Sequence, residues 1–343
     1  MREIDLKILI TGAFGNVGIY TLKNLLARRH QIRVLELKNK KNLKILNDLQ
    51  KKTGNDIDII WGDITDHAVV KRAVSGQDII IHQAFIIPDL SEKKPNWAWE
   101  VNVEGTRNLL RAAGEQETRA KIIFTSSVSV FGKTQDQEPP RTATGQVKPT
   151  DNYSHHKVAC EQLVKISGLD WTILRLGAVL SPSLCEIDPM LFSVPLGNRI
   201  ELVHAADAGL ALANAVNNES VWGKTLLIGG GKRCQMLQKD FISKVLDEVG
   251  LGMFPEYAFS SKPFYTDWMD TTESQQLLAY QEKDLDDFLV DIRRVLGIRR
   301  YLIKAVQPIV KYWILKKSPY LPGKKPAITR TGPKVKGSPV SAV

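Results

Sequence analysis

The fold is decided by the stretch Lys7-Ile8-Leu9-Ile10-Thr11-Gly12-Ala13-Phe14-Gly15-Asn16-Val17-Gly18. Its first four residues predict a short buried strand, and the three glycines then lead into an amphipathic helix that continues to about His30. Glycine lacks the side chain that would keep a pyrophosphate away from the backbone, and the first N–H groups of a helix attract such an anion. The stretch therefore predicts a dinucleotide site.

A second predicted strand, residues 31–37, contains an acidic residue near its end. Glu36 stands 24 residues after Gly12, where a carboxylate accepts hydrogen bonds from the adenosine ribose hydroxyls. This order of elements favours a nucleotide site over a flexible glycine loop: a strand, a glycine turn, a helix, a second strand and an acidic residue. Glu36 also favours NAD, because it would repel a 2′-phosphate, but three lysines within residues 38–41 could accept that phosphate. NAD is the preferred cofactor and NADP the alternative.

The composition is typical of a soluble enzyme with one large or two smaller α/β domains. The chain has 343 residues, of which 43% are hydrophobic and 24% are charged. Its first apolar segment is the glycine-punctuated strand rather than a secretion signal, so we expect a cytoplasmic protein. Cys160, Cys185 and Cys234 are widely separated, which argues against disulfides and a bound metal.

Predicted strands and helices alternate beyond the first unit. Further strands are predicted at 56–61, 78–82 and 121–126, and helices at 42–51, 69–74 and 97–113. This alternation predicts a Rossmann-type, doubly wound parallel sheet, an α/β fold whose ligands lie at the carboxyl ends of the strands. Asp63, Ala84 and Ser126-Ser127 fall at those ends.

A helix predicted to begin at Asp151 carries a candidate catalytic pair. Tyr153 and Lys157 are four residues apart, so the phenol and the ammonium share one face of the helix. A lysine cation is expected to lower the phenol pKa from about 10 and to make the tyrosine a usable proton acceptor and donor. Ser127 could hydrogen-bond the same substrate oxygen. Such a pair alone is more often a solvated helix face, but its place after a dinucleotide fold favours catalysis.

Together these motifs resemble the extended short-chain dehydrogenase/reductase family, also called NAD-dependent epimerase/dehydratase. The resemblance covers about residues 5–290. Its motifs are the glycine turn, Gly62-Asp63, His82-Gln83-Ala84, Asn102 with Gly105-Thr106, Ser126-Ser127 with Phe131-Gly132, Tyr153 with Lys157, Leu174-Arg175, Val203 to Asp207, Gly223 to Gly231 and Asp270 to Glu273.

The resemblance implies roles for individual residues. Tyr153 would be the acid/base, Lys157 would bind the nicotinamide ribose, and Ser127 would orient the substrate. The helices bearing Asn102 and Tyr153 would form the interface of a homodimer. The residues expected to bind the cofactor are Gly12, Phe14, Gly15, Asn16, Val17, Gly18, Glu36, Asp63, Ile64, Ala84, Asn102, Tyr153 and Lys157.

Departures from the family pattern narrow the chemistry. Val128 and Ser129 stand where nucleotide-sugar dehydratases carry acidic residues, which disfavours dehydration. Ala178 stands where sugar-nucleotide epimerases usually have an asparagine. We therefore expect an NAD(P)-dependent oxidoreductase that interconverts a secondary alcohol and its ketone by a Ser-Tyr-Lys mechanism, acting on a small molecule with a hydroxyl or carbonyl group. The alternatives are an NAD-dependent nucleotide-sugar epimerase and a non-catalytic nucleotide-binding or scaffold protein.

The expected division of the chain has three parts. Residues 1–182 form the dinucleotide-binding domain, with parts of 200–230 returning to it, and residues 183–297 form a substrate-side subdomain. In the latter, Met190, Leu191, Phe192 and Val194 are expected over the substrate, with core packing as the alternative. His204 either caps a helix or meets ligand, and the resemblance suggests a structural hydrogen bond for Asp207.

The third part, residues 298–343, is a basic amphipathic segment followed by a flexible tail. Residues 292–343 contain 13 Lys and Arg and no Asp or Glu, which leaves 34 basic and 37 acidic residues in the rest of the chain. The net charge of +10 therefore comes from the tail, and no nucleic-acid partner is expected at the active site. The segment either packs on the body as a helix or makes peripheral contact with the inner membrane surface.

Overall fold

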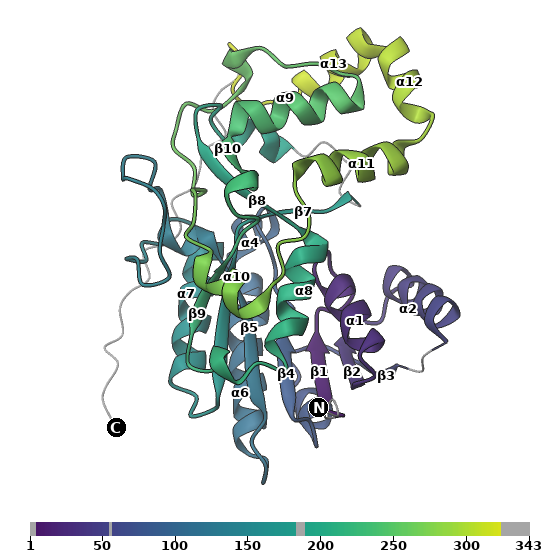
Figure 1. The fold of residues 1–343 in the computed structure, drawn as a ribbon, viewed down its shortest axis with the longest axis vertical. Helices are drawn as coiled ribbons and strands as arrows, with labels where there is room; N and C mark the ends of the chain where they lie inside the picture. The colour runs from purple at the N-terminus through teal and green to yellow at the C-terminus, as the bar shows by residue number, and fades with distance from the viewer. Residues whose placement is uncertain (1–4, 55–56, 183–188, 324–343) are drawn as a thin grey trace.

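A seven-stranded parallel sheet forms the centre of the protein (Figure 1). The computed structural model describes residues 5–54, 57–182 and 189–323. In sheet order the strands are β3 (Asp58–Trp61), β2 (Gln31–Glu36), β1 (Lys7–Thr11), β4 (Ile79–His82), β5 (Lys121–Ser127), β6 (Trp171–Leu176) and β9 (Thr225–Ile228). The order reverses between β1 and β4, which is where doubly wound sheets bind their ligands. The predicted Rossmann-type fold is confirmed.

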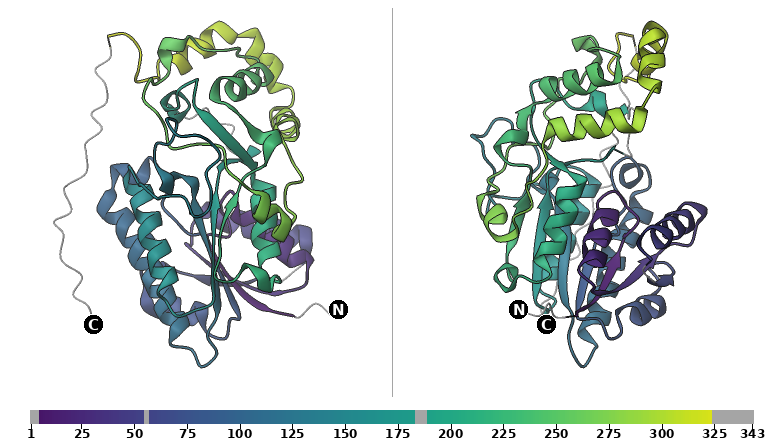
Figure 2. Two further views of the ribbon diagram at one scale, coloured as in Figure 1. Left: turned by 60° about the vertical axis from the view of Figure 1, so that its left-hand side comes forward. Right: turned by 45° about the vertical axis from the view of Figure 1, so that its right-hand side comes forward.

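Helices cover both faces of this sheet (Figures 1 and 2). Against one face pack α1 (Gly18–Ala27), α2 (Lys40–Thr53) and α8 (Ala205–Ala215), and against the other pack α3 (His67–Val74), α6 (Gly105–Gly114) and α7 (Asn152–Lys165). Ile8 and Ile10 of β1 belong to the first apolar cluster, and Leu9 between them belongs to the second. Two covered faces explain why β1 and β4 are buried on both sides rather than alternating.

The helix predicted at 97–113 is divided in the structure. It consists of α5 (Pro95–Trp99), a π-helical turn (Glu100–Glu104) and α6, preceded by the short α4 (Leu90–Lys93). A π turn inserts one extra residue and often marks a functional region. Asn102 lies in this turn, where its carbonyl oxygen accepts hydrogen bonds from the side chains of Thr106 and Cys160.

A smaller unit lies beyond the carboxyl ends of the strands (Figure 1). Its three-stranded sheet has the order β10 (Gln235–Leu237), β8 (Arg199–His204) and β7 (Ala178–Leu180), and β7 begins two residues after β6 ends. The helices of the remaining chain are α9 (Gln238–Val249), α10 (Thr272–Leu278), α11 (Leu285–Leu296), α12 (Arg299–Ala305) and α13 (Gln307–Leu315). None of the described helices is long and apolar enough to cross a membrane.

The apolar residues expected over the substrate are packed in this smaller unit instead. Phe192 is fully buried, with ring centroids 5.3 Å from those of Phe254 and Phe259. Val194 is also buried, and Leu191 packs on the same cluster. Core packing, the alternative, is therefore correct for these three residues, because aromatic neighbours from a distant segment enclose them. Residues 183–188 of this predicted region lie outside the described residues.

His204 and Asp207 both have structural roles. The Nδ1 atom of His204 accepts a hydrogen bond from the N–H of Ala206 and caps α8. An Asp207 carboxylate oxygen accepts hydrogen bonds from the backbone N–H groups of Glu282 and Lys283, at 3.1 and 2.9 Å. These bonds fasten the loop before α11 to the start of α8, as the prediction for Asp207 anticipated.

Candidate functional site

The glycine turn connects β1 to α1 with almost no free space. Gly12 has φ +71°, and a Cβ added there would lie 2.6 Å from the backbone nitrogen of Ala84. A Cβ added at Gly18 would lie 2.1 Å from the Gly12 carbonyl oxygen. Among the described residues no side chain caps the amino end of α1, and the N–H of Ile19 donates instead to the carbonyl oxygen of Gly15 at 3.1 Å. This cradle suits an anion such as a pyrophosphate.

Substituting Gly18→Ala tests the cradle. We expect a loss of about 1–3 kcal/mol in the free energy of unfolding from overpacking, and about tenfold or more weaker NAD binding. Gly114→Ala is the matched control, because a Cβ at that position meets nothing within 4 Å. Urea unfolding and NAD titration of both variants provide the measurement. Unchanged values for Gly18→Ala would show that the turn tolerates a side chain.

Glu36 extends from the end of β2 to the glycine turn. Its Oε1 accepts a hydrogen bond from the N–H of Phe14 at 3.0 Å, and its Oε2 accepts one from Asn42 Nδ2 at 3.2 Å. Burial raises the pKa of Glu36, and the hydrogen bonds from the Phe14 and Leu37 backbone and the charge of Lys41 oppose this shift. The predicted ribose acceptor therefore lies beside the predicted pyrophosphate cradle.

Asp63 and Ile64 follow β3, the edge strand next to β2. The Asp63 carboxylate accepts hydrogen bonds from the N–H and the hydroxyl of Thr65, both at 2.9 Å. Ile64 is buried, and its side chain fills the space beside Gly105, where a Cβ would lie only 2.6 Å away. Both residues are at the carboxyl edge of the sheet, as predicted, and their contacts within the protein shape that edge.

Asn102 holds the segment that follows β4. Its Oδ1 accepts from the N–H of Ile86 at 2.6 Å, and its Nδ2 donates to the carbonyl oxygen of Ile86 at 3.0 Å. Its Nδ2 also lies 3.2 Å from Nδ1 of His156. In the same segment, the N–H of Ala84 donates to the hydroxyl of Thr11 at 3.2 Å. Asn102 is fully buried, so in this structure it positions the segment that contains Ala84.

Ser127 and Tyr153 converge at the ends of β5 and α7. Asp151 caps α7 in a capping box with Ser154, which fixes the first turn of the helix as the sequence predicted. Tyr153 is half-buried, and the desolvation of its phenol raises its pKa to about 12. A hydrogen bond with Ser127 opposes the shift, and the charge of Asp151 adds to it. The phenol is therefore protonated at neutral pH.

Lys157 does not have the expected effect on the tyrosine. Its Nζ donates to the carbonyl oxygen of Thr125 at 2.6 Å and lies 3.4 Å from the ring centroid of Phe85. The Tyr153 ring centroid is 5.7 Å from the same nitrogen. Burial lowers the Lys157 pKa to about 7, so its positive charge is only partly present at neutral pH. The expectation of a lowered Tyr153 pKa is wrong here, because burial of both groups outweighs their attraction.

The lowered pKa of Lys157 predicts a dependence of stability on pH. The unfolded chain binds a proton at this lysine up to pH about 10.5 and the folded chain only up to about 7, so stability rises between these values. We expect the wild type to gain about 1.4 kcal/mol per pH unit relative to Lys157→Met between pH 8 and 9.5. Urea unfolding of both proteins across this window measures the difference. Parallel curves would contradict the burial of this ammonium.

Two aromatic residues near Tyr153 were not predicted. Phe85 makes an edge-to-face contact with the Tyr153 ring at 5.7 Å between centroids and also covers Lys157. Tyr265 hydrogen-bonds Asp151, and burial, followed by the nearby charges, raises its pKa. Phe85 directly follows Ala84, a predicted cofactor residue, so its position in the sequence could have indicated that it belongs to the site. Tyr265 lies in an irregular segment, and no sequence pattern connects it to Asp151.

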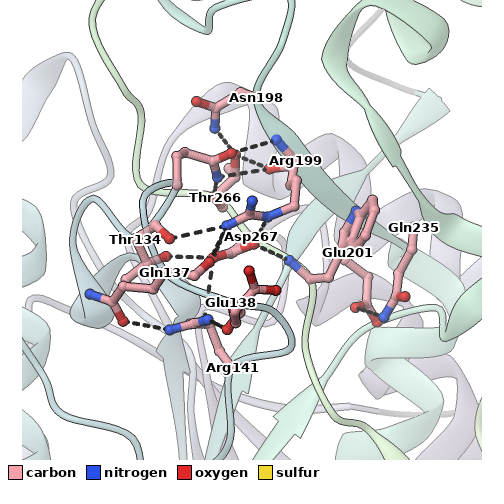
Figure 3. Close-up of polar contacts among 12 residues, drawn as sticks. Thr134, Gln137, Glu138, Arg141, Asn198, Arg199, Glu201, Gln235, Thr266 and Asp267 are labelled. Atoms are coloured by element: carbon pink, nitrogen blue, oxygen red, sulfur yellow. Dashed lines mark hydrogen bonds and ion pairs between the residues drawn. The ribbon is translucent and has the colours of Figure 1, made fainter.

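A network of polar side chains braces the substrate side of the site (Figure 3). Asp267 is buried, and its carboxylate pairs with Arg199 at 2.7 Å and with Arg141 at 3.3 Å. The Thr134 hydroxyl donates to the same carboxylate at 2.7 Å. The network joins the loop after β5 to β8 and to the segment before α10. Asp267 therefore pairs with both arginines and offsets one of their two positive charges.

Comparison with known proteins finds one matching family model and several similar enzymes. The family model described as "NAD dependent epimerase/dehydratase family" matches residues 8–194. The human 3 beta-hydroxysteroid dehydrogenase type 7 is 33% identical over 168 residues, 49% of this chain and 43% of that protein. The UDP-glucose 4-epimerase of Neisseria meningitidis serogroup C is 33% identical over 150 residues, 40% of this chain and 43% of that protein. The chain thus spans less than half the length of these two relatives.

Solved structures show the same fold. The UDP-glucose 4-epimerase of Thermotoga maritima, crystallised with UDP-glucose, has a TM-score of 0.70 at 18% identity, covering 85% of this chain and 100% of that one. A short-chain dehydrogenase/reductase superfamily protein of Agrobacterium tumefaciens with bound NAD has a TM-score of 0.69 at 17% identity, covering 88% and 99%. At these identities the likeness concerns the fold alone.

Proposed function

Since the chain belongs to the NAD-dependent epimerase/dehydratase family, we propose that it is an NAD-dependent oxidoreductase that interconverts a secondary alcohol and its ketone. The observation that carries this proposal is the proximity of Tyr153 and Lys157, with the Lys157 nitrogen 5.7 Å from the Tyr153 ring centroid. These side chains lie next to Phe85, in the segment that contacts the glycine turn through Ala84. A proton-transfer group and a nucleotide cradle are therefore connected by a few direct contacts.

The residues at the carboxyl edge fit a dinucleotide. Gly12 and Gly18 leave the backbone bare where a pyrophosphate would approach, and Glu36 would accept the hydrogen bonds of a ribose. The Glu36 carboxylate supports NAD over NADP, because a 2′-phosphate would meet its charge. When bound, NAD supplies a hydride acceptor in one redox state and a hydride donor in the other. Lys157 would bind the nicotinamide ribose.

Tyr153 would transfer the proton of the reacting hydroxyl group. With a pKa of about 12 it holds its proton at neutral pH and can donate it to a carbonyl oxygen that becomes a hydroxyl. In the oxidising direction the phenol would first have to lose its own proton, and the resulting phenolate would take the proton of the substrate hydroxyl. Ser127 would hydrogen-bond the substrate oxygen and keep it in line with the phenol. Burial of the site keeps bulk water away from this exchange.

Nucleotide-sugar epimerisation is the second candidate. The similarity to UDP-glucose 4-epimerases favours it, and it uses the same proton and hydride transfer. The ion pairs of Arg141 and Arg199 with Asp267 count against it, because both cations are held by this carboxylate and one of their two charges is offset, while a sugar diphosphate is strongly anionic. The similarity to hydroxysteroid dehydrogenases instead supports a less polar alcohol.

A homodimer is part of the proposal. The helices next to Asn102 and Tyr153 would form its interface, in a region where Trp97 and Trp99 are both exposed. Aromatic residues are enriched in such interfaces. Native mass spectrometry provides the measurement, and a monomer at micromolar concentration would contradict this part.

Assays with two substrate types separate the candidates. We expect NADH to form when the protein is incubated with NAD⁺ and a panel of secondary alcohols that includes 3β-hydroxysteroids. Conversion of UDP-glucose to its 4-epimer without net NADH formation would instead establish the epimerase. NAD binding without turnover of either type would contradict both and leave the nucleotide-binding or scaffold protein.

A further inference from the structure

The last two described helices, α12 and α13, expose a row of apolar side chains. They lie at the end of the molecule remote from the amino terminus, next to α9 and α11 (Figures 1 and 2). Ile298, Leu302, Ile309 and Trp313 are 77%, 63%, 61% and 65% exposed. Ile298 and Leu302 are four residues apart at α12, and Ile309 and Trp313 are four residues apart on α13, so each pair lies on one side of its own helix. We call these four residues the outer row.

The opposite side of the same helices is fixed to the body. Ile303, Val310 and Ile314 pack against an apolar cluster that contains Phe254. The side chain of Gln307 donates to the carbonyl oxygen of Leu251 at 2.7 Å. The prediction that this segment packs on the body as a helix is therefore confirmed for one face of α12 and α13. Since these contacts hold the helices, the outer row is not needed for packing and remains as an exposed apolar surface, which commonly marks an interaction site.

The surroundings of the outer row are basic. Among the described residues, 292–323 contain eight basic and no acidic residues. Arg293 and Arg300 pair with Glu248, and Arg294 pairs with Asp291, so part of this charge is compensated by neighbouring helices. Arg299, Lys304 and Lys317 are exposed beside the apolar side chains. The surface thus combines apolar contact area with excess positive charge.

We propose that the outer row binds the surface of an anionic lipid bilayer. Helices too short to span a membrane can lie in its interface, with tryptophan and aliphatic side chains among the lipid chains and lysines at the phosphates. A second copy of the chain is a poorer partner, because a twofold contact would set two basic surfaces against each other. Nucleic acid matches the charge but does not require the apolar row. The inference goes beyond the proposed reaction, because it concerns where the protein works.

Co-sedimentation of the full chain with vesicles tests this inference. The vesicles are phosphatidylcholine alone or phosphatidylcholine with about a third phosphatidylserine. We expect the wild type to pellet with the anionic vesicles, and the triple variant Leu302→Ser, Ile309→Ser, Trp313→Ser to bind them at least about tenfold more weakly. The matched control is Ile166→Ser, because Ile166 is 80% exposed at the end of α7. It should bind like the wild type.

Two further measurements make every outcome decisive. Thermal unfolding and NAD affinity should be equal in the three proteins, which separates this test from that of the proposed function. Equal vesicle binding by the triple variant and the wild type would overturn the inference. A wild type that ignores vesicles would also overturn it. In that case, a wild type that is dimeric together with a triple variant that is monomeric would identify a second copy as the partner. Binding of duplex DNA by the wild type but not by the triple variant would identify nucleic acid.

Discussion

Tyr153→Phe should lower turnover by about 10²–10⁴-fold, the usual contribution of a positioned acid or base. The substitution removes only the phenol oxygen and keeps the ring that packs against Phe85. The protein should therefore fold normally and bind NAD within about threefold of the wild-type affinity, a change below 1 kcal/mol. Turnover is measured with whichever alcohol or UDP-sugar the wild type converts.

The control for this substitution is Tyr257→Phe. Tyr257 is 56% exposed in the smaller unit, so the loss of its hydroxyl should change neither turnover nor NAD affinity. Residual activity of Tyr153→Phe above about a tenth of the wild-type value would count against acid/base catalysis by this residue. Loss of NAD binding together with turnover would point to a binding role instead.

Arg175→Met should destabilise the protein by about 3–5 kcal/mol, the typical cost of breaking a buried ion pair on one side. Arg175 on β6 forms two hydrogen bonds to the Glu161 carboxylate of α7, at 2.9 and 2.7 Å, and both side chains are buried. Ser126 at the end of β5 donates to the same carboxylate at 2.6 Å. Without the arginine, the Glu161 charge would remain buried with one neutral partner.

The effect of Arg175→Met should extend to the active site. Glu161 is one helical turn from Lys157 and two from Tyr153, so its pairing holds the catalytic helix against the sheet. Urea unfolding measures the stability. Lys224→Met is the control, because Lys224 pairs with Glu273 at an exposed site and such pairs contribute at most about 1 kcal/mol. Equal destabilisation by Arg175→Met and Lys224→Met would show that the buried pair of Arg175 and Glu161 does not stabilise the packing of α7 on β6.

The fold was predictable because its signals are local. The glycine turn requires bare backbone, the strands are apolar over their full length, and Asp151 is a good N-cap whose side chain bonds the third residue of its helix. Each of these features depends on residues close together in the chain. The parallel sheet then follows from alternating strands and helices with short connections.

The electrostatics of the site were not predictable, since burial depends on distant segments. The spacing of Tyr153 and Lys157 places them on one helix face, but Phe85 from the segment after β4 and Thr125 from β5 determine what surrounds the ammonium. Phe192 shows the same limit, because the aromatic residues that enclose it come from about 60 residues later in the chain. The adjacency of Tyr265 to Asp151 likewise appears only in three dimensions.

The most direct test of the account is a crystal structure of the protein with NAD. We predict that C4 of the nicotinamide lies within about 4 Å of the space shared by the Tyr153 and Ser127 oxygens, close to the reacting distance. We also predict that the pyrophosphate lies against Gly12 and Gly18 and that Lys157 reaches the ribose. A nicotinamide bound away from Tyr153, or a phenol that faces bulk solvent in the complex, would contradict the proposed mechanism.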